Sequence, residues 1–136
     1  MVDSKSGNQQ HAHDRQRYAC RRSRRCPAIT PAEAADLVAK AEALIVDVRD
    51  GTEVTASGKV KGALAVSRGL LEFRADPDLP THDPALRKDR PVILYCGSGG
   101  RAALAGKTLV EMGFKDVRNV GGFKGLVEAG WSVEPG

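Results

Sequence analysis

The chain has 136 residues, enough for one domain of ordinary size, and its 41% hydrophobic and 28% charged residues are the balance of a soluble globular protein. No apolar stretch approaches the roughly 20 residues of a membrane-spanning helix. The first 26 residues are polar and basic and lack the apolar centre of a secretory signal, so we expect a cytoplasmic protein without a membrane partner.

Positive charge is concentrated at the beginning of the chain. Residues 1–26 contain seven Lys or Arg side chains and two Asp side chains, a net charge of +5 in a chain whose total is +4. Residues 27–136 therefore carry a net charge of −1. The polar composition of the first segment predicts a flexible basic arm, and residues 27–136 are expected to form the domain. Such an arm can bind a polyanion, but we interpret it as a solvated leader and expect no nucleic-acid partner.

A helix and a buried strand are the first elements that the sequence predicts. Thr30, Pro31 and Glu33 form a capping box with proline at the first helical position, so a helix should run from there to about Ala41. Residues 44–48 are mostly apolar and are followed by charge, the pattern of a buried parallel strand. A brief helix is then expected at residues 50–55, a turn at 58–62 and a short strand at 63–66. A helical turn at 69–73 and a proline-rich surface loop at 76–89 follow.

The second half of the chain contains the clearest strand, at residues 91–95. A helix is expected at 102–112, because apolar residues recur there at spacings of three and four, with Gly113 as its cap. A last strand at 117–120 and a last helix at 123–129 follow. Strands that alternate with helices predict an α/β fold in which helices cover both faces of a parallel sheet. Functional residues in such folds collect at the carboxyl ends of the strands.

Cys96 follows the clearest strand and opens a glycine-rich loop that leads into a helix. The unpaired amides and the dipole of a helix N-terminus favour an anion, and so favour the reactive thiolate of a cysteine placed there. Glycines let successive amides turn toward one centre, and an arginine adds positive charge where the helix begins. The residues expected to form this cradle for a thiolate or a persulfide are Gly97, Ser98, Gly99, Gly100 and Arg101.

The cysteines also allow plainer interpretations. A free cysteine at a strand end is most often a small buried hydrophobe, but the glycines and the arginine that follow Cys96 favour a nucleophile. The loop offers zinc no second cysteine or histidine, so no metal site is expected. Cys20 and Cys26 lie in the arm and are expected to be exposed thiols without a role, although they could pair with each other or resolve a persulfide. Three cysteines are too few for a disulfide scaffold.

The order of four segments gives the chain a family resemblance. Residues 44–49, 58–63, 92–101 and 120–123 resemble successive motifs of the rhodanese homology domain, and the resemblance covers about residues 28–135. It implies a three-layer fold with a five-stranded parallel sheet flanked by helices. It also implies a sulfurtransferase that moves sulfane sulfur from a donor such as thiosulfate to cyanide or a thiol, through a Cys96 persulfide and without a cofactor. Asp47 and Arg49 match the family's Asp-x-Arg and would brace the active loop.

Donor recognition is where the chain departs from the family pattern. Lys59 and Lys61 replace the His and the Pro of the family's Gly-His-Ile-Pro-Gly-Ala segment, which would put two movable cations near the entrance. The loop itself lacks the basic side chains that many thiosulfate-using members carry beside the cysteine. Arg68 and Arg74 are further candidates to attract a dianionic donor, although each such residue is more often a solvated surface charge.

Two other functions stay open at this point. The domain could be a persulfide carrier or docking module that acts on a protein partner, although docking modules of this family usually lose the cysteine that is present here. Phosphatases of the same fold place five residues between cysteine and arginine, whereas four separate Cys96 from Arg101. The shorter loop favours a pocket for one sulfur atom over one for phosphate, and the sequence identifies no acid for a leaving group.

Overall fold

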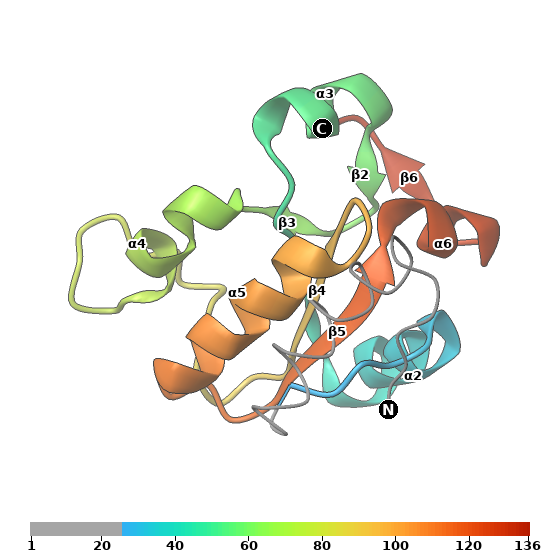
Figure 1. The fold of residues 1–136 in the computed structure, drawn as a ribbon. Coiled ribbons are helices and arrows are strands. Elements are labelled where there is room, and N and C mark those ends of the chain that lie inside the picture. Colours follow the sequence, from blue (N-terminus) through green and yellow to red (C-terminus); the bar gives the residue numbers. More distant parts are fainter. Residues whose placement is uncertain (1–25) are drawn as a thin grey trace, which may run out of the picture.

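A four-stranded parallel sheet forms the centre of the computed structural model, which describes residues 26–136. The strands lie side by side in the order β3-β1-β4-β5, and Figure 1 shows β4 and β5 next to each other. Their bounds are Leu44–Asp47 for β1, Leu64–Ala65 for β3, Val92–Cys96 for β4 and Val117–Gly122 for β5. Every residue of β1 and β4 is buried, as expected for central parallel strands covered on both faces.

Helices follow the strands as the sequence predicts. The capping box is present: the Thr30 hydroxyl accepts a hydrogen bond from the Glu33 amide, and the Glu33 carboxylate accepts one from the Thr30 amide. The helices are α2 (Pro31–Ala41), α3 (Gly51–Ser57), a 3₁₀ turn (Arg68–Leu70), α4 (Leu71–Ala75), α5 (Gly100–Glu111) and α6 (Phe123–Glu128). The brief helix expected after the first strand is therefore present as α3, and the helical turn expected at residues 69–73 is the 3₁₀ turn with α4.

Alternate residues of the strands divide the core into two layers. Val46 and Leu94 point into a cluster with Leu109 of α5, and the same cluster contains buried residues of α4. Ile45 and Ile93 point to the opposite face, into a cluster with side chains from α2 and α6. In Figure 1, α5 lies across the sheet in front of β4. The three-layer α/β arrangement is thus confirmed.

The number of strands in the sheet is four rather than the expected five. At the β5 edge, where a further strand could add, Ala28 forms only an isolated parallel bridge with Asn119. The Ile29 amide donates to the Asn119 carbonyl, and the Asn119 amide donates to the Pro27 carbonyl. Proline has no amide to extend this ladder, and Thr30 already caps α2, so the segment is too short to form a strand.

A two-stranded antiparallel sheet that the sequence did not indicate joins the connection after α3 to the end of the chain. Strand β2 (Lys59–Val60) pairs with β6 (Val133–Glu134). Gly58 makes the approach possible: its φ is +79°, and a Cβ there would lie 2.7 Å from the Glu134 carbonyl oxygen. As a result the C-terminus lies beside α3 (Figure 1).

The expectation that Cys26 is an exposed thiol is wrong. Its side chain is fully buried in the core cluster beneath α5. Gly106 provides the space, since a Cβ at that position would lie 2.2 Å from the Cys26 sulfur. Cys20 and the rest of the expected arm lie outside the described residues.

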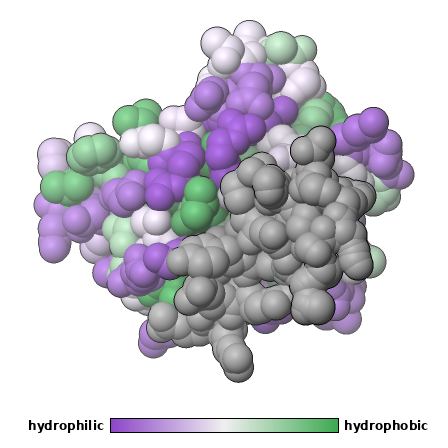
Figure 2. All heavy atoms as spheres, viewed as in Figure 1, coloured by the Kyte–Doolittle hydropathy of each residue, from purple (hydrophilic) through white to green (hydrophobic). Residues whose placement is uncertain are grey.

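Within residues 26–136, no helix is long and apolar enough to cross a membrane. On the face shown in Figure 2, hydrophobic residues are scattered among hydrophilic ones wherever the surface is coloured, and they do not form one continuous patch.

Candidate active site

Cys96 ends β4, and its sulfur is held by the loop that follows. The side chain is 1% exposed, and Sγ accepts a hydrogen bond of 2.9 Å from the amide of Gly99. Gly99 has a φ of +101°, a left-handed conformation that glycine adopts without strain, and it forms the N-cap of α5. The loop therefore turns back so that a helix N-terminus faces the sulfur.

The five residues expected to form the cradle come together around this turn. Gly97 and Ser98 are exposed, Gly99 is buried, and Gly100 and Arg101 form the first turn of α5. Among these, the Gly99 amide makes the direct contact with the sulfur. No loop side chain larger than serine lies between Cys96 and Arg101, so residues 97–100 place no charged side chain beside the sulfur.

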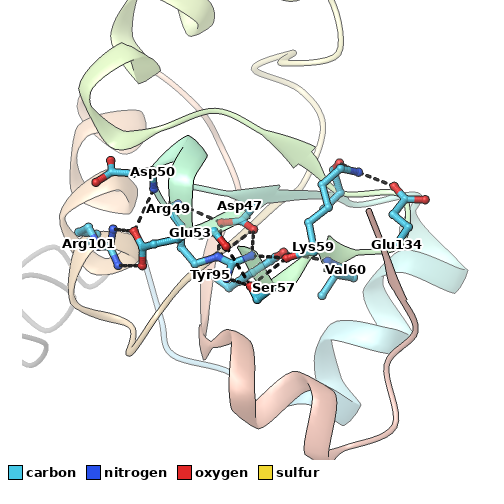
Figure 3. A network of polar contacts seen from close by, with 12 residues as sticks. Asp47, Arg49, Asp50, Glu53, Ser57, Lys59, Val60, Tyr95, Arg101 and Glu134 are labelled. Carbon is cyan, nitrogen blue, oxygen red and sulfur yellow. Dashed lines mark hydrogen bonds and ion pairs between the residues drawn. The ribbon is translucent and has the colours of Figure 1, made fainter. Parts of the chain in front are cut away.

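Arg101 does not extend freely from the loop, because Glu53 of α3 binds it. The two terminal guanidinium nitrogens donate to the two carboxylate oxygens at 2.6 and 3.0 Å. Glu53 also accepts a bond of 3.1 Å from the Asp50 amide, which closes a capping box at the start of α3. The hydrogen bonds that Arg101 donates lower the pKa of Glu53 to about 2, and acceptance of the same bonds by Glu53 raises the pKa of Arg101 above its ordinary value. Figure 3 shows this pair at one end of a polar network.

The start of α6 supports the opposite side of the loop. A Cβ on Gly122 would lie 2.5 Å from the carbonyl oxygen of Gly97, so the two segments touch through their backbones. Asn119 of β5 donates from its amide side chain to the Gly99 carbonyl at 3.2 Å, and its side-chain oxygen accepts from the Gly121 amide at 2.8 Å. Sequence reasoning did not single out Asn119, although it lies two residues after Val117 and therefore shares the buried face of the strand.

Asp47 and Arg49 form a buried ion pair at the end of β1. The exposed fractions of their side chains are 0% and 5%, and the closest contact is 2.7 Å. Arg49 also donates to the Ser57 hydroxyl at 2.8 Å and to the Gly58 carbonyl at 2.7 Å. Its guanidinium carbon lies 4.2 Å from the centroid of the Phe123 ring, within the range of a cation–π contact.

These contacts bind Arg49 to the end of α3, and α3 carries the Glu53 that holds Arg101 (Figure 3). Burial acts against the charge of Arg49, but the hydrogen bonds and the charge of Asp47 outweigh it and raise the pKa of the guanidinium. The pair thus connects to the active loop through a helix, by an indirect route.

With this geometry in place, comparison with known proteins identifies the family. Residues 30–129 match the sequence profile of the Rhodanese-like domain. The chain belongs to this family.

A sulfurtransferase and a tRNA hydroxylase are among the relatives of known sequence. The thiosulfate sulfurtransferase GlpE of Pseudomonas putida is 33% identical over 98 residues, which are 71% of this chain and 80% of the relative. The tRNA uridine(34) hydroxylase of Nitrobacter winogradskyi is 30% identical over 94 residues, which are 69% of this chain and 36% of the relative. The chain therefore spans about a third of the hydroxylases that it matches.

Two solved structures resemble nearly the whole chain. A protein of unknown function from Rhodopseudomonas palustris, described as a possible tyrosine phosphatase, has a TM-score of 0.77 and 32% identity, covering 98% of each chain. The polysulfide-sulfur transferase of Wolinella succinogenes, a homodimer, has a TM-score of 0.67 and 30% identity, covering 98% of this chain and 93% of that one.

The cations that were candidates for attracting a donor to this rhodanese-like site are largely engaged elsewhere. The Lys59 ammonium binds the Glu134 carboxylate and the Ala63 carbonyl, and its side chain is only 16% exposed. The expectation that Lys59 is a movable cation is therefore wrong. Arg68 donates to Glu72 and to Thr108 of α5. Two candidates are exposed, Lys61 and Arg74.

Proposed function

We propose that this protein is a sulfurtransferase that carries sulfane sulfur as a persulfide on Cys96. The observation that carries the proposal is the bond of 2.9 Å between the Cys96 sulfur and the Gly99 amide, at the N-terminus of the 12-residue helix α5. An amide and a helix dipole directed at sulfur favour its anionic form. The same environment suits the outer sulfur of a persulfide, which also carries negative charge.

The reaction consists of two displacements at sulfur. The Cys96 thiolate attacks the outer sulfur of the donor, the sulfur–sulfur bond of the donor breaks, and the bonding pair leaves with the first product, which is sulfite when the donor is thiosulfate. An acceptor nucleophile, cyanide in an assay or a thiolate, then attacks the outer sulfur of the persulfide. The Cys96 thiolate leaves and is regenerated, so neither a cofactor nor an oxidant is consumed.

The relatives support sulfur transfer as the type of reaction. GlpE and the Wolinella succinogenes protein are both named as sulfur transferases, and the chain covers most of both. The hydroxylases match only through a part of their length, so they support a rhodanese-like domain and no particular reaction. The acceptor is a small molecule or a thiol of a protein partner, and the small, uncharged side chains of residues 97–100 obstruct neither.

Phosphate-ester hydrolysis is the competing function, because the Rhodopseudomonas palustris structure is described as a possible tyrosine phosphatase. The geometry favours sulfur transfer. Only four residues separate Cys96 from Arg101, and Glu53 occupies both terminal nitrogens of the arginine. A phosphate group would need those nitrogens. We therefore expect no turnover of p-nitrophenyl phosphate by the purified protein.

The decisive experiment is intact-mass measurement after incubation with thiosulfate and, separately, with glutathione persulfide. The wild-type protein should gain one sulfur atom from at least one donor, and Cys96→Ser should gain none. The control combines Cys20→Ser with Cys26→Ala, because alanine avoids burying a hydroxyl in the core, and it should still gain the sulfur. A Cys96→Ser protein that takes up sulfur as wild type does would overturn the proposal.

A further inference from the structure

The guanidinium of Arg101 is the charged group of the active loop, and a carboxylate already binds both of its terminal nitrogens. Arginine recognises carboxylates, sulfonates and phosphates by presenting two N–H donors to two oxygens. In this protein both terminal nitrogens of Arg101 donate to Glu53, at 2.6 and 3.0 Å. An oxyanion that approached Arg101 would have to replace the Glu53 carboxylate or bind beside its negative charge.

Several contacts fix Glu53 in this position. Its carboxylate accepts from the Asp50 amide, and its backbone carbonyl accepts from the Ser57 hydroxyl at 3.0 Å. Ser57 in turn is bound by Arg49, whose charge is buried against Asp47. The pair is about a third exposed, but α3 positions its acidic member, so it is more than a chance surface contact.

The pair lies beside the loop that covers Cys96. A Cβ on Gly97 would lie 3.2 Å from a terminal nitrogen of Arg101 and 3.7 Å from a carboxylate oxygen of Glu53. A donor that reaches the sulfur past Gly97 therefore meets a neutral ion pair. The other two cations of the network in Figure 3 are also paired, Arg49 with Asp47 and Lys59 with Glu134.

We propose that Glu53 determines donor specificity: by occupying Arg101 it weakens the binding of oxyanion donors such as thiosulfate and favours sulfane sulfur carried on a thiol. This inference rests on the proposed function of Cys96. With a thiol persulfide R–S–SH, the Cys96 thiolate attacks the outer sulfur, the S–S bond of the donor breaks, and RS⁻ leaves with the bonding pair. The product on the enzyme is Cys96–S–SH, and no sulfonate has to be bound.

Glu53→Gln tests the proposal, because glutamine keeps the capping box of α3 while it removes the negative charge. The variant should lower the KM for thiosulfate about tenfold, the size of effect expected when one charge-assisted contact becomes available. It should also lower the ratio of kcat/KM for glutathione persulfide to kcat/KM for thiosulfate. Glu53→Ala should change both quantities in the same direction, and adding Arg101→Gln to Glu53→Gln should abolish the gain.

Glu111→Gln is the matched control, since it removes a carboxylate from an exposed pair with Lys107 at the far end of α5. Glu111→Gln should leave KM and kcat/KM unchanged for both thiosulfate and glutathione persulfide. A merely structural defect cannot explain a gain of thiosulfate affinity in the Glu53 variants. An unchanged or higher KM for thiosulfate in both Glu53 variants, or an equal gain in Glu111→Gln, would overturn the proposal.

A binding readout separates this proposal from the proposed function. Sulfate should slow the alkylation of Cys96 by iodoacetamide in Glu53→Gln, followed on the Cys96 peptide, and should have little effect on the wild type. That protection does not require sulfur transfer. If protection appears but no donor loads Cys96, the proposed function fails while the masking of Arg101 stands; if donors load but no protection appears, the specificity proposal fails.

Discussion

Gly122 is the residue at which the support of the active loop can be tested most directly. Its backbone is extended, with a φ of −112°, so alanine is allowed there by conformation. The added Cβ would nevertheless lie 2.5 Å from the Gly97 carbonyl oxygen, and backbone cannot yield as a side-chain end can. We expect Gly122→Ala to lower the free energy of unfolding by about 1–3 kcal/mol and to slow sulfur loading of Cys96.

Gly125 provides the control for this change. It lies in α6, and a Cβ there would meet nothing within 4 Å. Gly125→Ala should therefore stabilise the protein by about 0.5–1 kcal/mol through helix propensity alone. Urea unfolding measures both free energies, and intact mass measures the loading. Equal stability of the two variants would show that Gly122 and Gly97 do not touch.

The Glu53 carboxyl leads to a second prediction at the residue scale, about how the stability of the protein depends on pH. The pKa of its carboxyl is about 2, below the ordinary 4.5, because Arg101 stabilises the charged form. The folded state thus binds this proton more weakly than the unfolded state. The stabilisation is complete above the ordinary pKa and is lost as the pH falls toward about 2. The pair is partly exposed, so solvent screening limits its contribution to the free energy of unfolding to about 0.2–1 kcal/mol.

Urea unfolding of wild type and Glu53→Gln at a series of pH values measures this effect. The wild type should be the more stable near pH 6, and the difference should shrink steadily below about pH 4.5. A difference that stays constant down to pH 3 would mean that the Glu53 charge is not its cause.

Residues differ in how well the sequence reveals their partners. The Cys96 loop could be predicted because its strand, its glycines and its helix are neighbours in the chain. The partner of Arg101 lies 48 positions away, at Glu53, and the spacing of Asp50 and Glu53 indicates only a helix start. Lys59 looked like a free cation because Glu134, its partner, is 75 positions away.

At the scale of elements, α3 depends on a single buried cation. Arg49 binds the Ser57 hydroxyl and the Gly58 carbonyl at the end of this helix, and its charge is balanced by Asp47. Arg49→Met should destabilise the protein by about 3–5 kcal/mol, because it leaves the buried Asp47 charge without a partner. Hydrogen exchange of the α3 amides should rise as well, since the helix loses two of its anchoring contacts.

Arg118→Met is the matched comparison, because Arg118 pairs with Asp116 at a site that is about a third exposed. The Arg118→Met change should lower the free energy of unfolding by at most about 1 kcal/mol. Denaturant unfolding and hydrogen exchange on both variants give the comparison. Similar costs for the two arginines would contradict the view that the Arg49 pair anchors α3.

The helices and the long strands could be predicted at this scale, whereas the short pairings could not. The capping box at Thr30 and the apolar spacing of α5 are local signals that the chain carries by itself. Strands β2 and β6 have two residues each, too few for any periodicity, and they form because the fold brings residues 59–60 to residues 133–134. The family resemblance implied a fifth strand without indicating its residues. At the β5 edge, Pro27 and the start of α2 limit any further pairing to one bridge.

For the whole molecule, the burial of Cys26 places the start of the domain core at or before this residue. The composition of residues 1–26 suggested that the domain starts at residue 27, yet the Cys26 side chain is fully buried in the core. One apolar side chain in a polar and basic segment gives no periodic signal, and its site against Gly106 of α5 exists only in the folded molecule.

Two deletions test this boundary. Removal of residues 1–25 keeps Cys26 and the backbone bonds that join Pro27 and Ile29 to Asn119, so the melting temperature should stay close to that of the full chain. Removal of residues 1–29 takes away the buried thiol, the packing of Ile29 and both of those bonds. We expect the removal of residues 1–29 to lower the free energy of unfolding by about 2–4 kcal/mol and to weaken sulfur loading, because Asn119 also holds the Gly99 carbonyl.

Thermal melting and intact mass, measured on the two truncated proteins, test both expectations. A large loss on removing only residues 1–25 would show that the first segment packs on the domain, and equal stability of the two proteins would show that Cys26 and Ile29 are dispensable.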